Sequence, residues 1–117
     1  VLGIAVCDDE AYFQQKVRED MQAWKAEYQQ QLDITQLNIH VNAEHIGSGY
    51  AKATPEVFDT IKFLAKMEGL ILDPVYSGKA FHGLVQEIKA GHYSNAQDIV
   101  FIHTGGLFGL LAQRDQL

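Results

Sequence analysis

Apolar residues recur along the chain at two spacings, one typical of helices and one typical of buried strands. The first seven residues, Val1–Cys7, are an apolar run rich in β-branched side chains and predict a strand buried on both faces. Acidic residues follow, and from there to about Gln31 the pattern predicts a long helix whose start they would stabilise. Its apolar stripe has helical spacing and is expected to pack in the core: Phe13, Val17, Met21, Trp24 and Tyr28.

The second half of the chain carries clear boundary signals. Thr54 and Pro55 are a typical helix start, and Gly69 is a typical helix end. Another helix is predicted from about Ser77 to Ala90, with Gly91 closing it. Three shorter elements complete the prediction: a strand at Asn38–Val41, a buried strand at Asp98–His103 and an apolar helix at Leu107–Ala112.

This alternation of strands and helices predicts an α/β domain, with a mostly parallel sheet and helices on both faces. In such sheets, ligands bind beyond the carboxyl ends of the strands. Two polar segments follow strand-like runs, DPVYSGK at 73–79 and HTGG at 103–106. Both segments are therefore candidate walls of a functional site.

Composition narrows the classes of function. With 117 residues and 47% hydrophobic content, the chain is expected to form one domain with a real core. Its formal net charge of −6 and its lack of a Lys/Arg cluster argue against nucleic-acid binding. No apolar run is long enough for a membrane span. The single cysteine, Cys7, excludes an internal disulfide, and we expect a reducing, cytoplasmic setting.

One hypothesis is a phospho-receiver signalling domain. Asp8 and Asp9 end the first predicted strand, where paired acids could hold Mg²⁺. Asp73 would then be the phospho-acceptor and Thr104 a switch hydroxyl. Two features count against this hypothesis. An extra helix's worth of chain separates the paired acids from Asp73, and no lysine follows Thr104.

The other polar residues have structural as well as chemical interpretations. Lys79 lacks the rest of a phosphate-binding motif and lies in the first turn of a helix, so it must have a local partner or face solvent. The five histidines have no spacing typical of a metal site, and none is predicted; His103 is expected to be a hydrogen-bonded core residue. A constellation of hydroxyl groups remains: Tyr50, Tyr76, Ser77 and Thr104. Spacing alone leaves open whether they are structural or act on a ligand.

Two segments closely resemble one enzyme family. LAKMEGLILDPVYSGKAFHGLVQEIKAGHY at 64–93 and IVFIHTGGLFGLLA at 99–112 are similar to the D-cysteine desulfhydrase and 1-aminocyclopropane-1-carboxylate deaminase family of pyridoxal-phosphate enzymes. The resemblance is dense from about residue 47 to residue 112 and weaker before that. It implies the tryptophan-synthase-β-like fold (fold type II), pyridoxal phosphate as cofactor, a small amino-acid substrate and a homodimer.

The resemblance also implies roles for single residues. Tyr50, in GSGY, matches a tyrosine that lines the substrate pocket, and Tyr76 matches a second active-site tyrosine near the substrate's reacting end. Ser77 falls where the deaminases carry a glutamate beside the pyridine nitrogen and the desulfhydrases a small hydroxyl residue. Thr104 falls beside the same nitrogen, where the deaminases usually have leucine. We expect the two tyrosines to be catalytic, and Ser77, Thr104 and Gly105 to bind the cofactor.

The two hydroxyl positions favour one reaction. A carboxylate would keep the pyridine nitrogen protonated and make the ring a strong electron sink, which suits opening a strained carbon ring. A neutral hydroxyl leaves a weaker sink, which suffices for removal of the α-proton and β-elimination of thiolate. Ser77 and Thr104 therefore point to conversion of D-cysteine to pyruvate, sulfide and ammonia. Deamination of 1-aminocyclopropane-1-carboxylate is the alternative.

Part of the family's machinery has no counterpart in this sequence. The lysine that binds the cofactor and the phosphate-binding loop cannot be mapped onto the chain. We therefore expect residues 1–117 to be the C-terminal portion of the cofactor domain, inactive alone. Ala51 stands where the family usually has glycine, which predicts an altered loop backbone. An incomplete open sheet would also expose strand edges and apolar surface, which predicts self-association.

Overall fold

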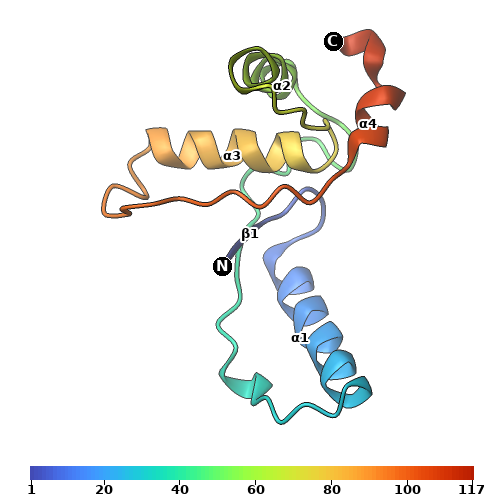
Figure 1. Ribbon diagram of the computed structural model, residues 1–117, viewed down its shortest axis with the longest axis vertical. Helices are drawn as coiled ribbons and strands as arrows, with labels where there is room; N and C mark the ends of the chain where they lie inside the picture. Colours follow the sequence, from blue (N-terminus) through green and yellow to red (C-terminus); the bar gives the residue numbers. More distant parts are fainter.

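Helices dominate the structure, and its one sheet is a pair of short strands. The computed structural model describes residues 1–117 (Figure 1). In chain order the elements are β1 (Leu2–Ile4), α1 (Glu10–Glu27), the 3₁₀ turn η1 (Ile34–Gln36), β2 (His40–Asn42), α2 (Pro55–Glu68), α3 (Ser77–Lys89), α4 (Leu107–Ala112) and the 3₁₀ turn η2 (Arg114–Gln116). None of the helices has both the length and the hydropathy that crossing a bilayer requires.

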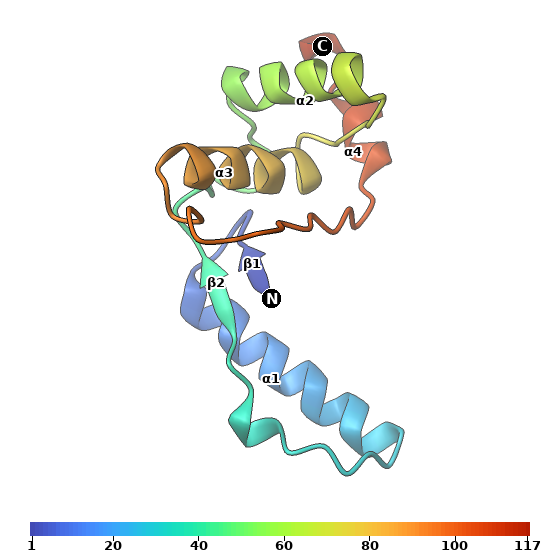
Figure 2. The same ribbon diagram turned by 60° about the vertical axis from the view of Figure 1, so that its left-hand side comes forward.

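The two strands pair in parallel, which confirms the predicted α/β class. Leu2 lies opposite His40, and Ile4 lies opposite Asn42. Because parallel strands need a long crossover, α1 joins them, and Figure 2 shows it running away from the pair before the chain returns to β2. The prediction of a first strand buried on both faces is wrong, since Leu2 is 41% exposed and only Ala5, just after β1, is buried.

Helix α1 begins where its sequence predicts, but its apolar stripe is not buried. The Asp9 carboxylate accepts a hydrogen bond from the Tyr12 N–H at 2.8 Å and so caps the first turn. The helix ends at Glu27, earlier than expected, and none of its residues is buried. Trp24 is 42% exposed. Core packing of this stripe was a wrong prediction because the main neighbours of α1 are β2 and η1, which cover little of it.

The core lies between α2 and α3, which pack against each other (Figures 1 and 2). Pro55 opens α2 as predicted, and Gly69 closes it with the left-handed backbone (φ 67°) that glycine tolerates best. The face of α2 toward α3 is apolar and buried: Val57, Phe58, Ile61 and Leu64. Leu72, from the segment that leads into α3, completes the cluster.

The predicted buried strand at 98–103 is extended but pairs with no other strand. Val100 is 83% exposed and Ile102 is 67% exposed, whereas Phe101 packs edge-on against Phe81 of α3, with ring centroids 5.1 Å apart. The prediction fails for a physical reason. A strand needs a neighbour for its backbone hydrogen bonds, and an open cleft separates this segment from β1.

Candidate active site

The turn before α3 is organised around one buried carboxylate, that of Asp73. This side chain has no exposed surface, and its two oxygens accept four hydrogen bonds. The donors are the backbone N–H groups of Val75 (2.7 Å), Tyr76 (2.9 Å) and Ser77 (2.8 Å) and the Ser77 hydroxyl (2.7 Å). Asp73 thus satisfies the free N–H groups at the start of α3 and places a negative charge at its positive end.

Ser77 is the first residue of α3 and is itself capped, because the carboxylate of Asp73 does the capping. Its side chain is only 3% exposed. The hydroxyl donates its single proton to Asp73 Oδ1 and accepts from the Asp73 N–H at 3.0 Å. Toward a ligand, Ser77 can therefore offer a remaining lone pair but no free proton.

Thr104 differs from Ser77 in its surroundings. It is exposed, and its hydroxyl has no hydrogen-bond partner within the chain, so its proton is available to a ligand. The neighbouring Gly105 has a left-handed backbone (φ 101°) and donates its N–H to His103 Nδ1 at 3.0 Å. His103 also contacts the Ile71 carbonyl oxygen at 3.0 Å, but it is exposed, so its predicted place in the core is wrong.

Tyr50 and Tyr76 come together although 26 residues separate them. Their hydroxyl groups are hydrogen-bonded to each other, and their ring centroids lie 5.9 Å apart at an interplanar angle of 66°. The Tyr50 hydroxyl, as hydrogen-bond partner, raises the pKa of Tyr76 above its ordinary value of 10.0, and desolvation adds to the shift. At neutral pH, Tyr76 is therefore a protonated phenol that can donate a hydrogen bond.

The loop that carries Tyr50 has an unusual backbone. Gly47 and Gly49 have positive φ angles of 70° and 127°, and Ala51 follows with φ 56°. Ala51 thus adopts the left-handed conformation that glycine would occupy at lower cost, a difference of about 1–2 kcal/mol. The Gln113 side chain donates to the Ala51 carbonyl oxygen at 3.2 Å and supports this turn from the other end of the chain.

An open apolar cleft of about 770 Å³ lies beside these residues. Its walls come from the first seven residues, from α1, from the extended segment at 99–102 and from the start of α3. Three of the predicted site residues line it: Tyr76, Ser77 and Thr104. Neither Tyr50 nor Gly105 is among the lining residues, although the Tyr50 hydroxyl is hydrogen-bonded to that of Tyr76. The structure therefore places three of the five predicted residues on the wall of one cleft and bonds a fourth, Tyr50, to one of these three.

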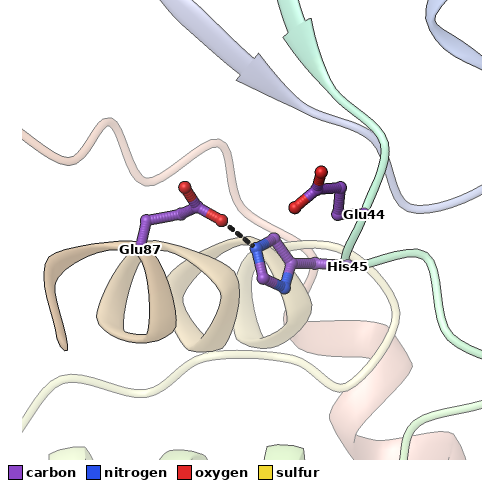
Figure 3. A group of neighbouring side chains, drawn as sticks. All are labelled: Glu44, His45 and Glu87. Carbon is purple, nitrogen blue, oxygen red and sulfur yellow. Dashed lines mark hydrogen bonds and ion pairs between the residues drawn. The ribbon is translucent and has the colours of Figure 1, made fainter. Parts of the chain in front are cut away.

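A second polar cluster lies near the C-terminal end of α3, where sequence spacing indicated nothing. His45 Nε2 lies 2.7 Å from Glu87 Oε1, and His92 Nδ1 bonds the other Glu87 oxygen. Hydrogen bonds from His92 and then His45 lower the pKa of Glu87 to about 2, and Glu87 in turn raises the pKa of His92. Figure 3 shows Glu44 pointing toward the same place. One carboxylate oxygen of Glu44, one ring nitrogen of His45 and one carboxylate oxygen of Glu87 lie within 4.8 Å of one another.

This cluster joins the loop after β2 to α3. Gly83 makes the contact possible, because a Cβ there would lie 2.8 Å from the His45 ring. Both carboxylate oxygens of Glu87 are bonded to histidines, so each oxygen has a hydrogen-bond partner within the protein. Sequence analysis missed the cluster because its members lie up to 48 positions apart and show no local spacing.

Comparison with known proteins identifies the class of this α/β structure. Residues 4–105 match the family described as pyridoxal-phosphate dependent enzymes. The chain belongs to this family.

Individual relatives narrow the likeness. The chain is 44% identical over 118 residues to the Arabidopsis thaliana protein named bifunctional D-cysteine desulfhydrase/1-aminocyclopropane-1-carboxylate deaminase, mitochondrial. The alignment covers 100% of this chain and 28% of the plant protein. A solved structure described as an ACC deaminase homologue is similar with a TM-score of 0.77 and 31% identity. It matches 98% of this chain and 34% of its own length. The chain thus spans about a third or less of these relatives.

The family and the geometry together show that the receiver hypothesis is wrong. A phospho-acceptor must be open to solvent, but Asp73 is fully buried and all its hydrogen bonds go to its own turn. Asp9, one of the paired acids, caps α1 instead.

The cleft suits one end of pyridoxal phosphate. A flat pyridine ring needs apolar walls and a hydrogen-bonding group at its nitrogen, and the cleft offers apolar walls together with the hydroxyls of Ser77 and Thr104. None of its lining residues is a lysine or an arginine. These residues therefore fit the ring of the cofactor and contribute no charge toward its phosphate.

Proposed function

We propose that the protein containing these 117 residues is a pyridoxal-phosphate-dependent lyase that converts D-cysteine and water to pyruvate, sulfide and ammonia. The observation that carries this proposal is the pair of neutral groups, Ser77 and Thr104, on the wall of the apolar cleft. When bound, the cofactor withdraws electrons from the substrate's α-carbon, so that the α-proton and then the thiolate can leave.

The residues of this chain would have separate roles in the proposed reaction. Thr104 would donate the hydrogen bond to the pyridine nitrogen, since the Ser77 proton is already bonded to Asp73. Ser77, whose orientation Asp73 sets, would offer the ring a neutral group. Tyr76 would give a proton to the departing sulfur, and Tyr50, whose hydroxyl is bonded to that of Tyr76, would orient it.

The same family supports a second candidate, 1-aminocyclopropane-1-carboxylate deamination. The name of the plant relative includes both activities. The residue at position 77 distinguishes the two in our proposal. A carboxylate there would stabilise a protonated pyridine nitrogen and a stronger electron sink, but the chain has a serine.

The wider setting of the chain is also a proposal. The span of 28% of the plant relative supports placing the cofactor's lysine and phosphate-binding loop in another part of the same enzyme, with residues 1–117 as the C-terminal portion of its cofactor domain. We further propose a homodimer. The compartment remains a prediction: the plant relative is named mitochondrial, and the single Cys7 is compatible with a reducing cytoplasm.

The test is sulfide release from D-cysteine by the full-length protein containing these residues, with L-cysteine and 1-aminocyclopropane-1-carboxylate run in parallel. We expect sulfide from the D-isomer. Thr104→Val should lower kcat/KM about tenfold, which corresponds to about 1.4 kcal/mol, and Thr104→Ser should restore most of it. Ammonia from the cyclopropane substrate without sulfide from D-cysteine would show that the hydroxyl pair does not decide the chemistry.

A further inference from the structure

Lys79 is a buried cation that the proposed chemistry does not use. It is 2% exposed and lies in the first turn of α3, where the helix dipole disfavours positive charge. Its ammonium group has no carboxylate partner. It donates instead to three backbone carbonyl oxygens, those of Gly49 (2.6 Å), Ile46 (2.9 Å) and Val6 (3.4 Å). Burial lowers the pKa of Lys79, so these carbonyl groups must offset its desolvation.

Two of these carbonyl groups connect Lys79 to the loop that carries Tyr50. Ile46 and Gly49 belong to the loop that ends in Tyr50, and Gly49 directly precedes it. The hydroxyl of Tyr50 is bonded to that of Tyr76, which immediately precedes α3. Lys79 lies one helical turn after Tyr76. Two contacts therefore join the loop to the start of α3, the Lys79 ammonium on one side and the tyrosine pair on the other.

We propose that Lys79 is a positioning residue that holds Tyr50 in hydrogen-bond contact with Tyr76. This inference rests on the proposed function, in which Tyr76 acts on the substrate. Exposed tyrosines such as these, 55% and 44% accessible, have little packing to fix them. The bonds from Lys79 to Ile46 and Gly49 supply the restraint that packing does not.

The His45–Glu87 pair provides an internal comparison. It also attaches this loop to α3, but it does so five residues before Tyr50. If any attachment of the loop sufficed, Glu87→Gln and Lys79→Met would have the same effect on the tyrosine pair. The proposal requires that Lys79→Met disturb the pair more, because Lys79 bonds the residue next to Tyr50.

The experiment uses the full-length protein containing these residues and follows tyrosine ionisation by ultraviolet absorbance. Lys79→Met preserves most of the side-chain volume but removes the charge. We expect it to lower the raised pKa of Tyr76 toward its ordinary value, as Tyr50→Phe should. The double variant Lys79→Met, Tyr50→Phe should show no further change in the pKa of Tyr76. Lys89→Ala, which removes an exposed lysine of the same helix, is the matched control and should leave the titration unchanged.

Activity and chemical rescue complete the test. Lys79→Met should lower kcat/KM for D-cysteine on the order of 100-fold, and this loss should vanish in a Tyr50→Phe background. Lys79→Ala leaves room for a free cation, so ammonium or methylammonium ions should restore its tyrosine titration and its activity but should not rescue Lys79→Met.

A lower melting temperature with an unchanged tyrosine titration would overturn the proposal and make Lys79 a purely structural residue. Additive losses of kcat/KM in the double variant Lys79→Met, Tyr50→Phe would also overturn the proposal. If the unmodified protein releases no sulfide but the titration changes as expected, the proposed function fails and the positioning by Lys79 stands.

Discussion

The region of α2, α3 and the turn between them and the region around the open cleft have similar hydrophobic patterns but differ in burial. All buried residues except Ala5 lie between Val57 and Glu87, in α2, α3 and the turn that joins them. Helix α1 has an apolar stripe as regular as the inner face of α2, yet none of its residues is buried. The difference is that α2 has α3 against it, while the main neighbours of α1 are the short elements β2 and η1, and Phe13 and Val17 of its stripe border an open cleft. An amphipathic pattern identifies the apolar face of a helix, but that face becomes buried only where another element packs against it.

The largest expected effect is on the molecular mass in solution, which tests whether the region around the cleft is exposed. In the region around the open cleft, β1 and β2 each have one unpaired edge, and Val100 and Ile102 are exposed. We expect residues 1–117 on their own to self-associate in analytical ultracentrifugation. The double variant Val100→Lys, Ile102→Lys should shift the distribution toward monomer. A monomer in the unmodified chain at micromolar concentration would contradict the prediction.

Next in size is the loss of the carboxylate that organises the region of α2, α3 and the turn between them. Asp73→Ala leaves three backbone N–H groups and the Ser77 hydroxyl without their acceptor in a buried turn. We expect the free energy of unfolding of the full-length protein to fall by roughly 4 kcal/mol, measured by urea denaturation. Asp59→Ala, at an exposed position of α2, is the control and should cost less than about 0.5 kcal/mol.

A pair of core and stripe substitutions sharpens the comparison directly. Ile61→Ala removes a side chain that is 2% exposed, and it should cost about 3 kcal/mol. Trp24→Ala removes a larger side chain from α1, but with 42% exposure it should cost less than about 1 kcal/mol. Equal losses in urea denaturation would mean that the stripe of α1 is covered in solution.

The smallest effect is expected from pH at the histidine cluster. Because Glu87 raises the pKa of His92 above 6.5, the pair stabilises the fold fully below pH 6.5 and loses this contribution as pH rises through the folded-state pKa. The lowered pKa of Glu87 acts in the opposite direction, since its contribution is present above pH 4.5 and is lost as pH falls toward 2. The urea midpoint should therefore decline on both sides of this window, and Glu87→Gln should flatten both slopes.

Local signals in the sequence determined much of the framework. Pro55 and Gly69 mark the ends of α2 because a fixed φ suits a helix start and a left-handed residue suits a helix end. The stretch DPVYSGK predicted a polar turn before a helix, and the structure has one. Resemblance added the family and the expected roles of Tyr50, Tyr76, Ser77 and Thr104. The structure places the last three of these on one cleft and bonds Tyr50 to Tyr76.

Contacts between distant residues were decided by tertiary structure alone. No local pattern joins Lys79 to the carbonyl oxygen of Gly49, or Glu87 to His45, because backbone acceptors and long-range ion pairs leave no spacing in the sequence. The segment at 98–103 has the composition of a buried strand, but strand formation needs a neighbouring backbone, and in this chain the segment has none. Local chemistry sets where elements begin and end, whereas pairing and burial depend on which surfaces meet.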